Sequence, residues 1–218
     1  MKRSTRNPVR TRQEIIEKSA PIFNVHGISG TSMKMLVNAT GFQMGGIYRH
    51  FDTKMDLAKA AFQYNYEMLV RPNLRIYPDL NPKEQLLKVF ESYKKMVFNP
   101  KVAGGCPILN TAIEVDDTDE EFRELAKKNT EEIISTIEGI LDKGIMEGFF
   151  HDSIEPWKEA QFIFASIEGA LMICTLTKSM DPISDIFERT LAYFDDKIFT
   201  DKLLEFHSGG VNIISLLL

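Results

Sequence analysis

The sequence has few of the residues that build disulfide-rich or metal-binding proteins. It contains two cysteines in 218 residues, Cys106 and Cys174, which lie far apart and form no Cys-x-x-Cys pair. A disulfide framework is therefore not expected, and reduced thiols in a cytoplasmic protein fit best. The four histidines show neither the His-x-His nor the His-Glu-x-x-His spacing of metal sites. We therefore expect no metal and no cofactor.

Long apolar runs of the kind that mark a signal segment or a membrane protein are also missing. The chain starts with the polar, basic stretch MKRSTRNPVRTRQ, which is unlike a secretory signal. Its most apolar stretch, AQFIFASIEGALMICTLT, contains Gln161 and Glu168, and burial in a protein core explains it without a membrane. With 44% hydrophobic and 26% charged residues, the chain is predicted to be globular, with no membrane partner.

Positive charge is concentrated in the first 60 residues. They hold ten Lys and Arg against four Asp and Glu, a net charge of +6, whereas the rest of the chain carries −11. A basic head on an acidic body predicts that only the head binds a polyanion. From charge alone, a solvated basic terminus with no partner remains an equal alternative.

Nearly every segment repeats its apolar residues with helical period, and no convincing alternating strand pattern is found. We therefore predict an all-α fold of about nine helices. The first helix has its apolar face between Ile15 and Phe23, with a kink or a late start caused by Pro21 and an end at Gly27. Later helices are predicted to start at Pro82, near Ile108, after a capping box of Thr118 and Glu121, near Pro156 and at Asp181.

The segment from residue 31 to residue 50 has the spacing of a helix-turn-helix. Thr31 or Ser32 can cap a helix that ends at Gly41, where a left-handed conformation costs glycine nothing. A short third helix would follow over about 43–50. The second helix of such a motif enters the major groove of DNA, and needs polar or compact residues near its start.

A fourth helix is predicted directly afterwards. Thr53 and Asp56 form a capping box in front of an apolar stripe that begins at Leu57. This helix should end near Arg71, because Pro72 follows.

The stretch GISGTSMKMLVNATGFQMGGIYRHFDTKMDLAKAAF resembles the DNA-binding domain of the tetracycline-repressor (TetR) family. The resemblance spans Ile15 to Phe62 and is most specific in the IYRHF run with the Lys and Leu that follow it. It implies a homodimeric repressor whose third helix enters the major groove of double-stranded DNA at a palindromic operator. Tyr48, His50, Lys54 and the start of the fourth helix would then contact phosphates. The predicted DNA-binding residues are Thr31, Ser32, Gln43, Met44, Gly45, Gly46, Tyr48, Arg49, His50 and Lys54.

Two residues depart from the family pattern where bases would be read. The family commonly has Ser or Thr where Gln43 stands, and often Lys where Met44 stands. Gln43 is able to bond an adenine edge through two hydrogen bonds, and Met44 is able to touch a thymine methyl group. Gly45 has no side chain to read a base, but it permits a close approach to DNA.

The C-terminal part resembles a TetR subgroup more loosely, through GGCPILNTAIEVDDTDEEFRELAKK and SIEGALMICT. This resemblance implies a small-molecule pocket enclosed by the fourth to eighth helices, and a dimer interface formed by the last two long helices of each subunit. The predicted ligand-binding residues are Phe90, Tyr93, Met96, Asn110, Phe149, Trp157 and Phe162. The predicted dimer-interface residues are Ile163, Ile167, Leu171, Phe187, Leu191 and Phe194.

The predicted domains follow from these features. A DNA-binding domain covers residues 1–52, a ligand-binding and dimerisation domain covers 53–206, and the fourth helix (53–71) links them. The apolar tail, 207–218, has no role that we can assign.

We therefore predict a cytoplasmic, ligand-responsive repressor, not an enzyme. It would bind its operator as a homodimer, and a small apolar or amphipathic effector would release it. Two alternatives remain: a helical ligand-binding protein with no DNA-binding role, and an enzyme that uses Cys106 as a nucleophile. No Cys–His–acid arrangement supports the second alternative. For the aromatic and Met residues of the predicted pocket, simple core packing is the competing interpretation.

Overall fold

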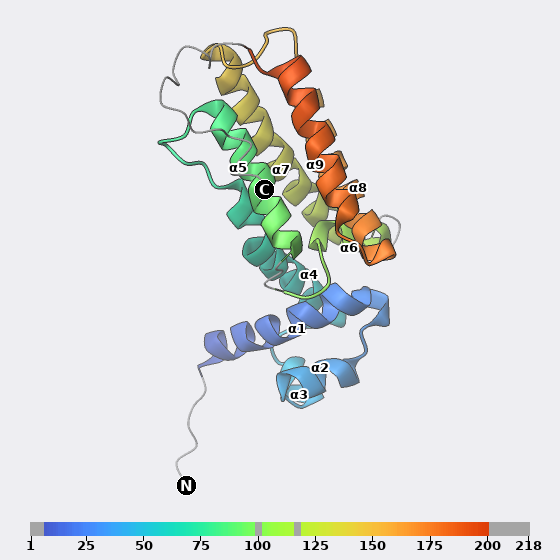
Figure 1. The fold of residues 1–218 in the computed structure, drawn as a ribbon. Coiled ribbons are helices and arrows are strands. Elements are labelled where there is room, and N and C mark those ends of the chain that lie inside the picture. Colours follow the sequence, from blue (N-terminus) through green and yellow to red (C-terminus); the bar gives the residue numbers. More distant parts are fainter. Residues whose placement is uncertain (1–6, 99–101, 116–118, 201–218) are drawn as a thin grey trace. The chain divides into compact units, whose positions relative to one another are not determined.

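The described part of the chain is built from α-helices. The structure, a computed structural model, describes residues 7–98, 102–115 and 119–200. These residues form nine α-helices with short π- and 3₁₀-helical segments, which confirms the predicted all-α fold (Figure 1). They divide into two compact units. The first unit is formed by the described residues of Met1–Pro72 and Pro100–Thr130, and the second by those of Asn73–Asn99 and Glu131–Leu218.

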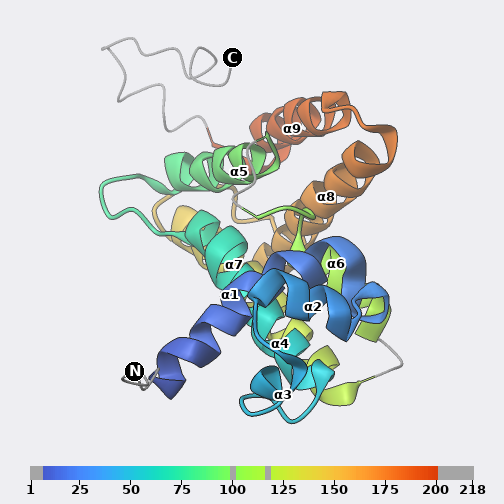
Figure 2. The same cartoon turned by 90° about the horizontal axis from the view of Figure 1, so that it is seen from below.

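The first unit contains the predicted helix-turn-helix. Helices α2 and α3 lie on one side of α1 (Figures 1 and 2). The buried face of α1, from Ile15 to Phe23, confirms the predicted apolar stripe. The helices of this unit are α1 (Pro8–Gly30), α2 (Met33–Thr40), α3 (Met44–Ile47), α4 (Lys54–Asn65), α6 (Pro107–Val115) and the beginning of α7 (Glu120–Met146).

Helix α1 departs from the prediction at Pro21. The helix neither starts late nor leaves helical geometry at this residue; it begins at Pro8, and its only residue with non-helical dihedral angles is Gly27 (φ 70°, ψ 176°). Pro21 itself is half-buried, between fully buried Ala20 and buried Phe23. Packing of this face stabilises the helix enough to outweigh the hydrogen bond that Pro cannot donate.

The local signals around the turn are confirmed. The Ser32 hydroxyl accepts the Met35 N–H at 3.3 Å, and Gly41 has the left-handed conformation (φ 74°) that ends α2. The predicted capping box of Thr53 and Asp56 starts α4. Helix α3 is shorter than predicted, because the residues after Ile47 form a turn.

The chain beyond α4 does not stop at Arg71. It continues as a π-helix, η1 (Tyr66–Val70), and a 3₁₀-helix, η2 (Arg71–Leu74). Pro72 lies in the first turn of η2, where its missing N–H is not needed.

The second unit is a group of long helices with an aromatic centre. The Phe90 ring packs edge-on against Phe187 and Phe194, with ring centroids 5.1 and 5.2 Å apart. Figure 1 shows the long helices of this unit running side by side. Its elements are α5 (Pro82–Phe98), the rest of α7, α8 (Pro156–Thr177), α9 (Asp181–Tyr193) and the π-helix η3 (Phe194–Ile198).

By length and composition alone, α8 qualifies as a membrane-crossing helix, a test that core helices of soluble proteins also pass. Two predicted features, the Thr118 part of a capping box and the tail 207–218, lie outside the described residues. The predicted domain boundaries remain a prediction, although in the described chain α6 belongs to the same compact unit as α1–α4.

Candidate DNA-binding surface and effector cavity

The turn between α2 and α3 is set on a buried frame. Leu36, Ile47 and Phe51 are almost completely buried, with exposures of 0, 1 and 3%. The Thr40 hydroxyl donates to the Leu36 carbonyl at 2.7 Å and accepts the Phe42 N–H at 3.2 Å, so the end of α2 is satisfied before the chain turns. The apolar frame therefore fixes how the short third helix is presented.

The solvent side of α3 carries the residues predicted to read bases. Gln43, Met44, Gly45 and Arg49 are exposed, and the Tyr48 ring is 41% exposed. Met44 is 49% exposed, so about half of this apolar residue is open to solvent. A flexible Met and a Gln are suited to contacts with a thymine methyl group and an adenine edge.

The two glycines of α3 are not required by the packing of the chain. A Cβ atom on Gly45 would meet nothing within 4 Å, and one on Gly46 would make only ordinary contact with the Phe42 side chain at 3.7 Å. Because Gly45 is exposed and has no side chain, another molecule is able to approach the backbone closely at this residue.

Three other predicted contact residues already have partners within the first unit. Thr31 is 1% exposed, and its hydroxyl donates to the Gly27 carbonyl at 2.6 Å. The Lys54 ammonium donates to the Ile28 carbonyl at 2.7 Å and the Thr31 carbonyl at 2.9 Å. Ser32 uses its hydroxyl to cap α2. The predicted DNA contact of Thr31 therefore needs a correction, because a buried hydroxyl cannot reach DNA. The Thr31 hydroxyl stabilises the end of α1 instead.

The start of α4 is occupied by the protein's own groups. The Thr53 hydroxyl accepts the Asp56 N–H at 3.0 Å, and the Asp56 carboxylate accepts the Thr53 N–H at 2.9 Å. A carboxylate at this end offsets the partial positive charge that attracts phosphate. The expected phosphate contact at this helix start therefore remains a prediction without added support.

Sequence reasoning missed two exposed polar residues of α2. Lys34 and Asn38 are one helical turn apart and both face solvent, whereas Leu36 between them is buried. Lys34 makes no ion pair within the part of the chain that the structure describes. The spacing of four residues on the polar side of α2 is the signal that could have identified them.

The predicted ligand-binding residues belong to both units and differ in burial, so a common site remains a prediction. Asn110 lies in the first unit, where its amide donates to the Asn24 carbonyl at 3.0 Å and to the Gly104 carbonyl at 2.6 Å. Phe90 and Tyr93 are buried in the core of the second unit, and Trp157 and Phe162 are exposed on α8. Phe149 and Met96 are half-buried. Core packing, the competing interpretation, therefore describes Phe90 and Tyr93.

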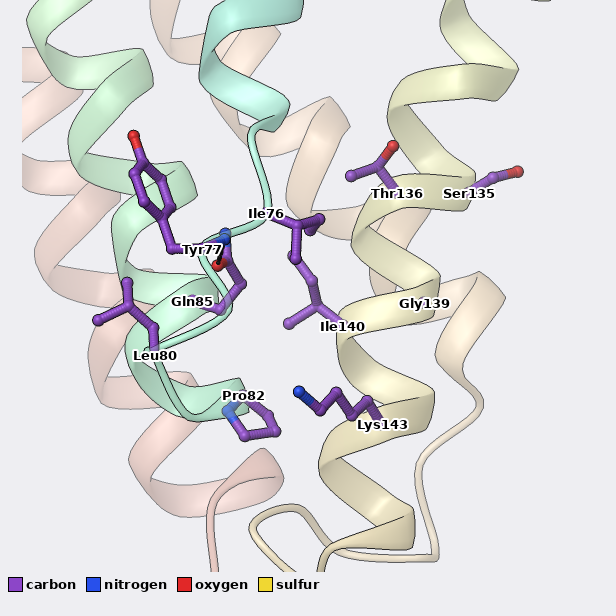
Figure 3. Close-up of a pocket in the computed structure, with 10 residues that line it drawn as sticks. All are labelled: Ile76, Tyr77, Leu80, Pro82, Gln85, Ser135, Thr136, Gly139, Ile140 and Lys143. Carbon is purple, nitrogen blue, oxygen red and sulfur yellow. Dashed lines mark hydrogen bonds between the residues drawn. The ribbon is translucent and has the colours of Figure 1, made fainter.

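A cavity of about 360 Å³ lies elsewhere in the second unit, within the size range of small-molecule sites. Figure 3 shows Ile140 and Lys143 extending from α7 toward the segment that carries Ile76 and Pro82. The Gln85 amide is engaged, since it accepts the Tyr77 N–H and donates to the Arg75 carbonyl, both at 2.8 Å. The lining residues are Ile76, Tyr77, Leu80, Pro82, Gln85, Ser135, Thr136, Gly139, Ile140 and Lys143.

The cavity is mostly apolar and has one cation. Within the described ranges, the Lys143 ammonium forms one long ion pair, 3.8 Å from a Glu147 carboxylate oxygen, and both side chains are about half exposed. Such a pair contributes little to stability. The site is therefore able to hold an apolar body and to offer an ammonium to an acceptor or anionic group.

Most of the predicted dimer-interface residues are buried within their own unit. Ile163, Ile167, Leu171, Phe187 and Phe194 are each at most 5% exposed, and Leu191 is half-buried. For these five buried residues the prediction needs a correction, because side chains already buried in one chain cannot supply the contact surface for another, whereas a contact through Leu191 remains a prediction. The large exposed apolar residues of α8 are instead Trp157, Phe162, Met172, Ile173 and Leu176.

Helices α8 and α9 are joined by a partly buried polar contact. The Tyr193 hydroxyl lies 2.9 and 3.0 Å from the two carboxylate oxygens of Glu159. Burial and then this hydrogen bond raise the pKa of Tyr193 to about 12.

The residue behind the enzyme alternative, Cys106, is 3% exposed, so a substrate would have no access to its thiol in this structure. No group of three or more His, Cys, Asp or Glu that could hold a metal is found in residues 7–98, 102–115 and 119–200.

Comparison with known families gives two matches that together extend over most of the chain. Residues 15–61 match a family described as "Bacterial regulatory proteins, tetR family", and residues 82–190 match "Tetracyclin repressor-like, C-terminal domain". The first match covers the helix-turn-helix, and the second begins with α5 and ends in α9.

Solved structures and a curated relative agree with these matches. A TetR transcriptional regulator from Chloroflexus aurantiacus J-10-FL is 31% identical, with a TM-score of 0.83 over 89% of this chain and 99% of that one. The TetR-family regulator from Cytophaga hutchinsonii is 34% identical, with a TM-score of 0.80 over 89% and 98% of the two chains. The HTH-type transcriptional repressor DhaR from Mycobacterium sp. (strain GP1) is 22% identical over 190 residues, which cover 85% of this chain and 94% of the relative.

Proposed function

Because this chain belongs to the TetR family of DNA-binding transcriptional regulators, we propose that it is a repressor that binds a palindromic operator as a homodimer. A small apolar or amphipathic effector releases it from DNA. The observation that carries this proposal is the exposed face of α3, with Gln43, Met44, Tyr48 and Arg49 in solvent above a fully buried apolar frame.

The basic head supports the DNA-binding role. The first 60 residues carry a net charge of +6 on a chain of net charge −5. Lys and Arg displace the counterions of DNA phosphates, so binding should weaken as salt is raised. The exposed Gln43 and Met44 supply contacts to base edges, and the cations supply affinity that is independent of sequence.

The outer face of α8 supports the homodimer. Phe162, Met172, Ile173 and Leu176 are 40 to 75% exposed, and spacings of three, four and eleven residues place several of them on one side of the helix. A contiguous apolar face of this kind marks an interaction site in a protein of this composition. A second copy of the chain placing the same face against it gives a two-fold symmetric dimer, which matches two half-sites of a palindrome.

The cavity beside Lys143 is the proposed effector site. Its apolar lining and single ammonium suit an amphipathic molecule with an acceptor or anionic group. Release from DNA requires that the effector bind more tightly to a conformation of low operator affinity than to the conformation that binds DNA.

Operator binding can be tested with fluorescently labelled DNA. Anisotropy should show that the protein prefers DNA from its own promoter region over random DNA of the same length at moderate salt. Two chains should bind each palindrome, and Tyr48→Phe combined with Arg49→Ala should weaken binding. Equal affinity for promoter and random DNA at every salt concentration would contradict the proposal.

The effector site can be tested with 1-anilinonaphthalene-8-sulfonate, a fluorescent amphipathic anion. Ile140→Trp should fill the cavity and Lys143→Gln should remove its cation, so both should weaken probe binding without changing affinity for the operator. Lys128→Gln, an exposed cation of α7 outside the cavity, is the control. Unchanged probe binding by Ile140→Trp would exclude this cavity as the site.

A further inference from the structure

The link between α1 and α2 is held at its backbone by side chains from two other helices of the first unit. The Glu114 carboxylate of α6 accepts the Ile28 N–H at 2.7 Å and the Ser29 N–H at 3.2 Å. The second side chain is Lys54 of α4, whose ammonium donates to the carbonyls of Ile28 and Thr31. The peptide groups on both sides of Ile28 are thus bound by charged side chains, the stronger kind of hydrogen bond.

Glu114 binds at the point where α1 loses its regular geometry. Gly27 has φ 70°, and a break in a helix leaves N–H groups that need new acceptors. A Cβ atom at Gly27 would lie 2.7 to 2.9 Å from the Glu114 carboxylate atoms. Glycine at 27 therefore serves two purposes, since it adopts the positive φ and leaves room for the carboxylate.

Helix α6 is fixed to α1 at a second place, one turn earlier. Asn110, four residues before Glu114, donates to the Asn24 carbonyl, and Asn24 donates in turn to the Ala103 carbonyl at 2.8 Å. Residues four apart lie on the same face of a helix. Asn110 and Glu114 therefore hold the last two turns of α1 with one face of α6.

We propose that Glu114 is a positioning residue for operator binding. It fixes the backbone of residues 27–31, and this segment sets where α2 begins and how α3 is presented. The inference rests on the proposed DNA-binding function for its consequence, and on the hydrogen bonds of Glu114 for its geometry. Because α6 falls within the segment that matches the C-terminal family domain, Glu114 joins that part of the sequence directly to the helix-turn-helix.

A purely electrostatic role and a positioning role for Glu114 predict opposite changes in operator affinity when the side chain is removed. Loss of a negative charge makes the first unit more basic, which by itself strengthens binding to any DNA. Loss of a positioning residue weakens binding to the operator and leaves binding to random DNA unchanged or tighter. The ratio of the two affinities is therefore the informative measurement, and a smaller fraction of folded protein does not change it.

The experiment compares Glu114→Ala and Glu114→Gln with wild-type protein. We expect Glu114→Ala to lower the operator-to-random affinity ratio about tenfold, equivalent to about 1.4 kcal/mol. Glu114→Gln, which keeps one acceptor oxygen, should lie in between. The control is Glu131→Ala, which removes the same charge from an exposed position on α7. If Glu114→Ala retains the wild-type ratio, or changes it only as Glu131→Ala does, the proposal is overturned.

Two further measurements keep the test independent of stability and of the operator. Glu114→Ala removes both acceptors, so hydrogen exchange measured by NMR should accelerate at the Ile28 and Ser29 amides, at least tenfold more than at the other amides of α1. Unchanged slow exchange at both amides in Glu114→Ala would refute the geometry, even if wild-type protein showed no operator preference. In a double-mutant cycle, Glu114→Ala should remove the part of the Gly27→Ala effect that comes from displacing the carboxylate and leave only the strain of the positive φ. Full additivity of the two substitutions would count against the proposal.

Discussion

At the scale of single residues, the partners of each cation decide which of them is available to DNA. Arg49 is exposed and makes no ion pair within the described ranges. Lys54 donates to two main-chain carbonyls, and Lys18 binds Glu14 at 2.8 Å and the Thr40 carbonyl at 3.2 Å. Arg49, Lys54 and Lys18 therefore differ in how available their positive charges are to DNA, although residue type alone does not distinguish them.

We predict that Arg49→Ala and Lys54→Ala weaken operator binding for different reasons. Arg49→Ala should lower the slope of log affinity against log salt concentration by about 1, with no change in melting temperature. Lys54→Ala should lower the free energy of unfolding by about 2 kcal/mol through the lost hydrogen bonds, and should change the slope less. The measurements are anisotropy titrations over a salt series and thermal denaturation. Identical slopes for both variants would contradict this distinction.

We also predict that Gly45→Ala separates folding from DNA binding. A Cβ at this position meets no atom of the protein, so the free energy of unfolding should stay the same or rise by up to about 1 kcal/mol. The added methyl group should nevertheless reduce operator affinity, because it lies on the face that we propose approaches DNA. Gly139→Ala on α7 is the matched control, since its Cβ also meets nothing within 4 Å. Unchanged operator affinity for Gly45→Ala would argue against close approach at this residue.

At the scale of elements, helices are held to one another by a few polar contacts within apolar packing. Helix α6 binds α1 through Glu114 and Asn110, and α9 binds α8 through the Tyr193 hydroxyl and the Glu159 carboxylate. Each of these contacts joins residues distant in sequence. They determine the relative position of two helices more specifically than apolar contacts do.

The contact between α8 and α9 predicts a pH dependence. The pKa of Tyr193 rises from 10.0 to about 12 in the folded protein, so the folded state holds this proton more tightly than the unfolded state. Its contribution to stability is complete below pH 10 and is lost as the pH rises through about 12. Tyr193→Phe should remove one tyrosine's share of the tyrosinate absorbance that develops near pH 12. Titration of all tyrosines near 10 would contradict the prediction.

At the scale of the whole molecule, the net positive charge and the exposed apolar face of α8 lie in different parts of the sequence. The net positive charge lies in the first 60 residues, and the exposed apolar side chains of α8 lie in the second unit. A protein that binds DNA with one part and a second copy with another needs this division, because the acidic remainder of the chain is repelled by phosphates.

We predict that Leu176→Glu produces monomers with weakened operator binding. Leu176 is 75% exposed in the single chain, so the substitution should not disturb folding. A charge buried without a partner in a two-fold interface should cost several kcal/mol. Sedimentation equilibrium measures the change, with Met146→Glu as the control, since Met146 is 80% exposed but lies on α7. A dimer as stable in Leu176→Glu as in wild-type protein would show that this face is not the interface.

The sequence by itself determined the features that depend on neighbouring residues. Periodicity predicted the helices, the Ser32 cap and the Gly41 turn predicted the helix-turn-helix, and Thr53 with Asp56 predicted the start of α4. These signals act within one or two helical turns, so they can be read without the fold. The concentration of positive charge in the head is likewise a property of composition.

Only the tertiary structure decided which side chains meet across long distances in the chain. It placed Glu114 against Ile28, 86 residues away, and assigned the Lys54 ammonium to main-chain carbonyls. It also buried the predicted interface residues, exposed Leu176 in their place, and put the cavity beside Lys143 rather than around Phe90. An apolar residue on a helix that is apolar almost all round can face the core or a partner equally well. That choice is made by the packing of distant helices, which periodicity cannot reveal.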